Sequence, residues 1–235
     1  MRNYRSGRGP FPERPYYKSE EIEDLCAQEL RKLELYPSRP EPVRIERFVE
    51  KRFGITVEYG DIEEGILGFT RFGPKGVEGI VVAKALADEE GKVAERRINT
   101  TLAHEAGHGL LHTHLFVLQE AAVSMFGADF DARSPKIICR DVLTPERRLI
   151  VYDGRWWEYQ ANQAIGALLM PRTLVEHCIT SLLTPSGSFG LPVLRPEKVT
   201  AAVRLLADTF NVNGAVAKIR IQQLFPENDG AQLTL

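Results

Sequence analysis

The string His104-Glu105-Ala106-Gly107-His108 has the form H-E-x-x-H, and the rest of the chain is best interpreted outward from it. On a helix, two residues four positions apart share a face, and they lie about 6 Å apart along the axis. Two imidazoles at that spacing can bind one tetrahedral zinc ion. Glu105 follows the first histidine and can act as general base on a zinc-bound water. The string therefore predicts a helix that carries two metal ligands and a catalytic glutamate.

A catalytic zinc site needs a third protein ligand. His112 lies about 12 Å from His104 on a straight helix, so the two cannot share one ion, and we expect His112 to support the site, contact substrate or pack. His114 stands where metzincins place their third histidine, but Leu111 replaces the glycine that breaks their helix. The carboxylate candidates are Glu120, Glu158 and Glu176.

Glu158 fits best among these carboxylates. It falls in a predicted apolar helix, residues 156–169, where Ala161, Ile165 and Leu168 indicate a packed face. A charged group beside such a face needs a partner if it is buried, and a metal ion is one such partner. The competing interpretation is an ordinary exposed helix glutamate, and the residue pattern alone leaves it open.

Two motifs resemble those of the ImmA/IrrE metallopeptidases. The first spans residues 101–112 and contains the H-E-x-x-H string. The second, which in that family reads approximately E-x-x-A-N-x-x-A-x-x-L-L-M-P, spans residues 158–171 here, with Gly166 at a position where alanine is usual. The resemblance covers about residues 43–225, strongly at the motifs and weakly elsewhere.

The resemblance implies that His104, His108 and Glu158 bind zinc and that Glu105 is the base. It also implies an α+β, gluzincin-like zincin fold, with a small antiparallel sheet packed on the motif helix. Members of the family are intracellular bacterial proteases that cleave helix-turn-helix repressors, in stress responses or the induction of mobile elements. The segment of residues 126–156 is longer than in better-known members, so the resemblance does not identify the repressor.

Periodicity and turn residues predict the other elements. Helices are expected at residues 19–33, 43–53, 156–169, 197–210 and 214–224, and strands at residues 55–59, 65–72 and 77–84. Gly54 is expected to end the second helix, and Asn99 or Thr100 to cap the motif helix. A hairpin is expected through residues 137–139 and 149–151, and a linker at residues 182–196.

These elements suggest three parts: a disordered arm (1–18), a metallopeptidase domain (19–182) and a C-terminal helical segment (183–235). Within the last segment, the stretch from Phe210 to Arg220 resembles a helix-turn-helix and a stretch common in the family. Only Lys218 and Arg220 are basic on its second helix. We therefore expect packing or repressor docking there rather than DNA contact.

The bulk composition narrows the class of protein. A net charge of −2 over 235 residues gives no electrostatic reason to expect binding to nucleic acid or membrane. The three cysteines, Cys26, Cys139 and Cys178, are widely spaced and suit a reducing compartment. The N-terminus has no apolar signal core, and no apolar run approaches the roughly 20 residues of a membrane span. We expect a cytoplasmic protein.

The sequence thus favours a zinc endopeptidase that cleaves a helix-turn-helix repressor. The alternative is a regulatory or toxin-partner protein that keeps the fold without proteolysis, and the intact Glu105 argues against it. A donor should stabilise the oxyanion that develops during peptide hydrolysis. The sequence does not single one out among the candidates, which are His112, His114, Tyr152, Tyr159 and Arg172.

Overall fold

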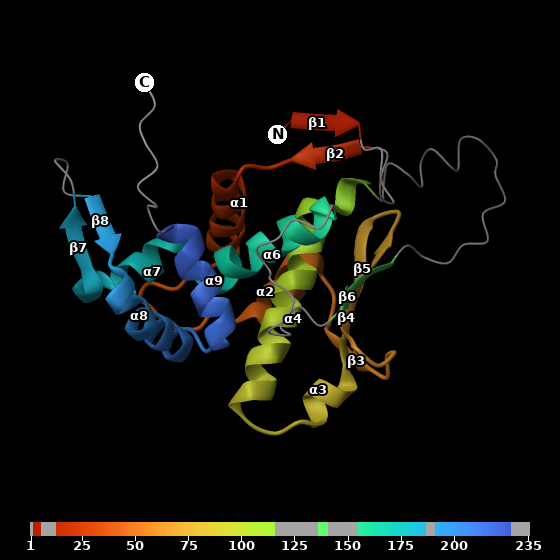
Figure 1. The fold of residues 1–235 in the computed structure, drawn as a ribbon. Helices are drawn as coiled ribbons and strands as arrows, with labels where there is room; N and C mark the ends of the chain where they lie inside the picture. The colour runs from red at the N-terminus through yellow and green to blue at the C-terminus, as the bar shows by residue number, and fades with distance from the viewer. Residues whose placement is uncertain (1, 6–12, 116–135, 141–154, 187–190, 227–235) are drawn as a thin grey trace.

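The computed structural model describes residues 2–5, 13–115, 136–140, 155–186 and 191–226. These residues form an α+β fold (Figure 1). In chain order its elements are β1 (Arg2–Arg5), β2 (Glu13–Tyr16), α1 (Ser19–Lys32), α2 (Ile45–Phe53), β3 (Glu58–Gly60), β4 (Ile66–Gly73), β5 (Gly76–Ala83), α3 (Lys84–Asp88), α4 (Lys92–Leu111), β6 (Lys136–Arg140), α6 (Trp156–Leu169), α7 (Arg172–Cys178), the 3₁₀ helix η1 (Thr180–Leu182), β7 (Leu183–Ser186), β8 (Leu191–Leu194), α8 (Pro196–Thr209) and α9 (Gly214–Leu224).

The largest sheet has the strand order β3-β5-β4-β6. Strands β4 and β5 form the expected antiparallel hairpin, but β3 runs parallel to β5, so the prediction of a purely antiparallel sheet was wrong. The reason is that β6 occupies the second edge of β4, which leaves β3 the free edge of β5. Residue alternation predicts which side chains share a face of a strand, but it does not select the neighbouring strand. Of the expected hairpin at residues 137–139 and 149–151, the first half is β6, and the second half lies outside the described residues.

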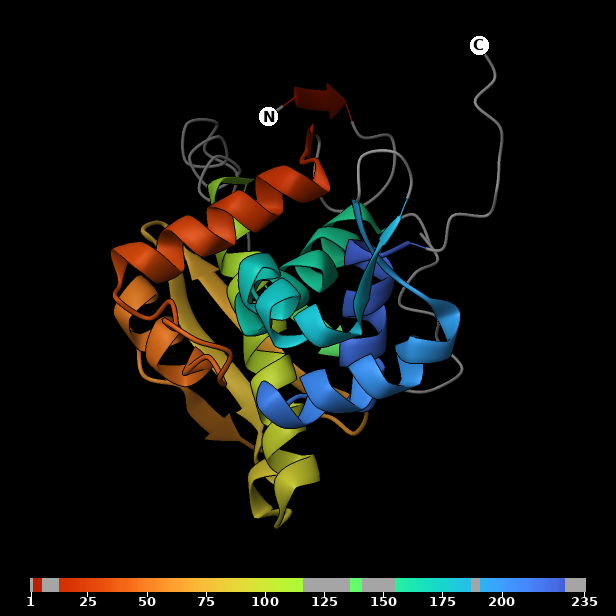
Figure 2. The ribbon, with the colours of Figure 1, turned by 90° about the vertical axis from the view of Figure 1, so that its left-hand side faces the viewer.

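The motif helix α4 lies between this sheet and helix α6 (Figures 1 and 2). It begins at Lys92, so the expected cap at Asn99 or Thr100 was wrong. The hydroxyls of Thr100 and Thr101 instead donate to the carbonyls of Arg96 and Arg97 one turn earlier. These hydroxyls donate inside the helix, so neither threonine is needed to cap it.

Helices α4 and α6 approach each other closely at Gly107. A Cβ atom on Gly107 would lie 2.9 Å from the Cβ of Ala164 and 3.2 Å from the Cα of Ala161. Small residues on both helices therefore set their separation, and this separation determines how far a side chain of α6 must reach to meet α4.

One hydrophobic core extends from α1 through the central helices to α9, and it includes Ile22, Leu102, Leu168 and Ile221. The C-terminal helices share this core, and the buried guanidinium of Arg220 in α9 pairs with Glu23 in α1 and donates to the carbonyl of Met170. The expected linker at residues 182–196 instead contains the strands β7 and β8, which pair with each other in antiparallel orientation.

The expected disordered arm at residues 1–18 contains a second small hairpin, β1–β2. Its backbone is anchored at Pro15, whose carbonyl accepts a hydrogen bond from Gln160 of α6. Gly54 ends α2 with φ 70°, as predicted for a glycine in the left-handed region. Among the described residues, no helix combines the length and the apolar character that a membrane span requires.

Candidate metal centre

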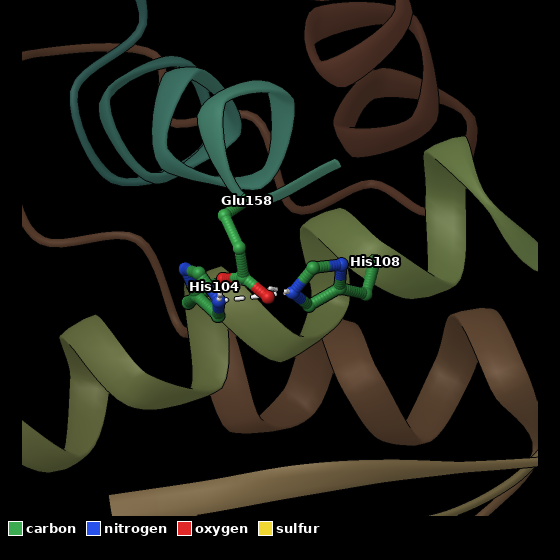
Figure 3. Close-up of side chains that lie close together, drawn as sticks. All are labelled: His104, His108 and Glu158. Atoms are coloured by element: carbon green, nitrogen blue, oxygen red, sulfur yellow. Dashed lines mark hydrogen bonds and ion pairs between the residues drawn. The ribbon is translucent and has the colours of Figure 1, made fainter. Parts of the chain in front are cut away.

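His104, His108 and Glu158 come together between α4 and α6 (Figure 3). The two histidines lie one turn apart on α4, and their Nε2 atoms are 2.9 Å from each other. Glu158 reaches down from the first turn of α6, with Oε2 at 3.2 Å from His104 Nε2 and 3.7 Å from His108 Nε2. One ligand atom from each residue lies within 4.8 Å of the others. Two imidazole nitrogens and a carboxylate form a common donor set of catalytic zinc.

The electrostatics of this cluster suit a cation. Burial lowers the pKa of His108, although the carboxylate of Glu158 acts in the opposite direction. Burial also tends to raise the pKa of Glu158, but positive charge on the rings of His108 and His104 outweighs it and holds that pKa well below its usual range. An ionised carboxylate in this position requires positive charge beside it. A divalent cation bound to neutral rings supplies that charge without protonating a buried imidazole.

The ring of His104 is oriented from α6 as well. Its Nδ1 lies 3.0 Å from Oδ1 of Asn162. An amide oxygen only accepts, so His104 carries its proton on Nδ1 and directs the lone pair of Nε2 toward Glu158. Glu158 and Asn162, one turn apart on α6, thus act on the same histidine from two sides.

Glu105 extends toward the sheet but stays close enough to the cluster for the charges of His104 and Glu158 to affect its pKa. Its Oε2 lies 2.6 Å from the hydroxyl of Thr70 in β4, and that hydroxyl is 3.2 Å from the backbone carbonyl oxygen of Glu105. A hydroxyl both donates and accepts. Thr70 can donate to the carboxylate, or accept from the carboxylic acid while donating to the carbonyl. One residue of the sheet can therefore hold Glu105 in both protonation states.

Glu105 has the properties of a general base. Burial raises its pKa to about 7, against the lowering effects of His104 and Thr70. Its other oxygen, Oε1, is buried and has no hydrogen-bond partner within the described part of the chain. A carboxyl group whose pKa lies near neutral pH can both take and release a proton under physiological conditions.

The remaining predicted candidates that the structure describes do not join the cluster. His112 lies beside His108 with its two nitrogens hydrogen-bonded to His108 and Gln160, so it supports the cluster and has no N–H left for an oxyanion. Tyr159 and Arg172 line a cleft that also includes residues of α1 and α9 and none of the cluster residues. His114 lines a separate cleft near Phe53 and Lys75. Glu176 belongs to α7 and is not part of the cluster. Glu120 and Tyr152 lie outside the described residues.

Three supporting residues were not predicted to have a role: Thr70, Gln160 and Asn162. Thr70 is a fully buried polar residue in a predicted strand, and such a residue signals a hydrogen-bond partner. Asn162 stands inside the second motif quoted above. The sequence carries no comparable signal for Gln160, because its partners lie 48 and 145 residues away.

Comparisons with known proteins add no assignment: no protein-family model and no curated protein matched this chain.

Proposed function

We propose that this protein is a zinc-dependent endopeptidase. The observation that carries the proposal is the convergence of His104, His108 and Glu158 beside a fully buried glutamate whose pKa is near 7. A site built only for structure closes the metal with protein ligands and has no use for a base beside it. Three candidate ligands with Glu105 next to them fit a catalytic site better.

Each residue has a distinct role in the proposed reaction. His104, His108 and Glu158 would hold the zinc ion, which when bound supplies Lewis-acid activation of water and of a peptide carbonyl. Glu105 accepts a proton from the attacking water on Oε1, which has no hydrogen-bond partner among the described residues, and delivers it to the leaving amine. Thr70 keeps the carboxyl of Glu105 in one orientation through both transfers.

The proposed substrate is a helix-turn-helix transcriptional repressor in the cytoplasm. The support is the resemblance of residues 101–112 and 158–171 to the ImmA/IrrE motifs, together with the meeting of these two segments at one cluster. Direct DNA binding by α9 has little support. Arg220, one of its two basic residues, is 1% exposed and paired with Glu23, which leaves Lys218.

The test uses purified full-length chain, first for bound zinc and then for cleavage of the helix-turn-helix repressor encoded beside its gene. We expect one zinc per chain and cleavage at a defined bond, with both abolished by Glu158→Ala. Glu105→Gln is the matched variant, and it should retain zinc without cleaving. Zinc binding with no cleavage by the wild-type chain would favour the regulatory or toxin-partner alternative. A chain that does not bind zinc contradicts the proposal altogether.

A further inference from the structure

We infer that His112, Gln160 and the backbone of the N-terminal strand at Pro15 form a directed hydrogen-bond chain that fixes His108 in its metal-binding tautomer. This inference rests on the proposed metal centre, and it assigns a function to three groups that lie outside the ligand set. It also gives the N-terminal strand β2 a role in supporting the site.

The direction of the chain is set at its outer end. Gln160 Nε2 lies 2.8 Å from the carbonyl oxygen of Pro15, and a carbonyl can only accept. The NH₂ end of the Gln160 amide therefore faces Pro15, and its oxygen faces His112. Gln160 is 4% exposed and Pro15 is buried, so bulk water does not compete for either hydrogen bond.

The orientation of Gln160 determines which nitrogens of His112 and His108 donate and which accept. His112 Nε2 lies 3.0 Å from Gln160 Oε1, which only accepts, so His112 carries its proton on Nε2. A neutral imidazole holds one proton, and its Nδ1 is then an acceptor. His112 Nδ1 lies 3.0 Å from His108 Nδ1, so His108 must donate there. The lone pair of His108 is left on Nε2, the atom that faces His104 and Glu158.

Packing around His112 and His108 keeps the hydrogen-bond chain in place. His112 and His108 are both fully buried. The ring of Trp156 meets His112 edge to face, with centroids 5.6 Å apart. His112 therefore cannot turn to another partner without displacing a buried tryptophan. Its role is that of a positioning residue: it acts on the metal through His108.

The two histidines of the cluster are thus supported by different means. His104 is oriented by Asn162, which lies on the same helix as Glu158. The support of His108 runs through α4, α6 and β2, so it depends on correct docking of an N-terminal strand. Partners of this outer kind affect metal affinity by about 10- to 100-fold.

The first measurement is the tautomer of His108 in zinc-free, ¹⁵N-labelled full-length protein at pH 8, read from long-range ¹H–¹⁵N spectra. We expect the proton on Nδ1 in the wild-type chain and a mixture of tautomers in His112→Phe. A wild-type His108 that carries its proton on Nε2 overturns the inference, whatever the metal affinity. The measurement needs no zinc, so it stands apart from the test of the proposed function.

The second measurement is the zinc dissociation constant, obtained by competition with a chromophoric chelator. His112→Phe and Gln160→Leu should each weaken zinc binding by about 10-fold or more, and His112→Gln, which restores an acceptor, should recover part of the loss. Gln163→Leu is the control, because Gln163 lies on the same helix but lines clefts toward α9. If the wild-type chain binds zinc and both variants, folded by circular dichroism, bind it equally well, the inference fails while the metal site stands.

A third variant tests the N-terminal end of the chain. Gln160→Glu keeps an acceptor for His112 but removes the N–H that Pro15 receives. We expect faster tryptic cleavage after Lys18, the basic residue between β2 and α1, in this variant than in wild type or Gln163→Leu. Equal cleavage rates in all three would exclude Gln160 as the anchor of the strand.

Discussion

The two faces of helix α4 carry different groups of the proposed site. The face toward α6 carries His104 and His108, whose third companion, Glu158, arrives from another helix. The face toward the sheet carries Glu105, which a strand residue, Thr70, holds. The proposed metal binding therefore depends on how two helices pack, whereas the proposed base depends on how one helix lies on a sheet. Because the faces have separate supports, each can be damaged without the other.

The largest effect is expected on the α6 face. Glu158→Ala removes the carboxylate that lies 3.2 and 3.7 Å from the Nε2 atoms of His104 and His108, and two histidines alone make an incomplete site. We expect loss of stoichiometric zinc, measured by elemental analysis after gel filtration, and with it loss of cleavage. Glu176→Ala, a glutamate of α7 outside the cluster, is the control and should retain zinc. Full zinc content in Glu158→Ala would identify a different third ligand.

On the sheet face, Glu105→Gln should separate binding from chemistry. The amide retains the shape of the side chain but cannot take a proton, and general-base catalysis typically contributes about 10²- to 10⁴-fold to rate. We expect turnover to fall by about that factor while zinc affinity stays within about threefold of wild type. Undiminished turnover would remove Glu105 from the mechanism.

The buried charge of Glu105 should also appear in the stability of the zinc-free chain. Burial raises its pKa from 4.5 to about 7, so the folded state binds the proton more tightly than the unfolded state. This contribution is fully present below pH 4.5 and is lost as pH rises through about 7. Glu105→Gln should therefore gain about 2 to 3 kcal/mol relative to wild type between pH 5 and pH 8 in urea unfolding. A difference that does not change with pH would mean that the carboxyl titrates normally.

A bulkier residue at Gly107 should disturb the α6 face of α4 and leave the sheet face in place, because it changes only the packing against α6. In Gly107→Ala the new methyl group meets backbone and Cβ atoms of α6, so the helices must move apart. We expect about tenfold weaker zinc binding and a loss of about 1 to 3 kcal/mol in unfolding free energy. Gly109→Ala is the matched control on the opposite face, where the methyl group meets the ring of Phe53. It should cost stability without weakening zinc binding, and equal effects on zinc affinity would show that the faces are not independent.

The smallest effect is expected at Thr70. Thr70→Val keeps the shape of the side chain but leaves Oε2 of Glu105 without its donor. We expect kcat to fall about tenfold with unchanged zinc content, since a hydrogen bond to a charged group is worth about 1.5 to 3 kcal/mol. Thr70→Ser, which keeps the hydroxyl, should retain most activity. If Thr70→Val and Thr70→Ser have the same kcat, Thr70 does not position the base.

The sequence predicted the parts of the site that depend on residues close together along the chain. The spacing of His104 and His108 follows from helix geometry, and Glu158 was favoured because it stands on a helix with an apolar face. The α+β class and most helix positions were confirmed for the same reason, since periodicity is a local property.

The parts that could not be predicted depend on tertiary neighbours. Nothing near Thr70 in the sequence indicates that it meets Glu105 in space, and nothing near Gln160 indicates Pro15. The parallel pairing of β3 with β5 likewise depends on which edge β6 leaves free. The start of α4 was placed too late because Asn99 and Thr100 both suit a cap. In the structure they lie inside the helix, where the hydroxyl of Thr100 donates to the carbonyl of Arg96.

The buried pair of Arg220 and Glu23 joins the last helix of the fold to the first, and the same guanidinium holds the carbonyl that follows α6. During synthesis on a ribosome, α6 therefore emerges before the residue that secures its C-terminal end. A nascent chain that stops before α9 leaves Glu23 without its partner and the helix bearing Glu158 without its final support. The proposed protease should thus become competent to cut only after translation has passed residue 220.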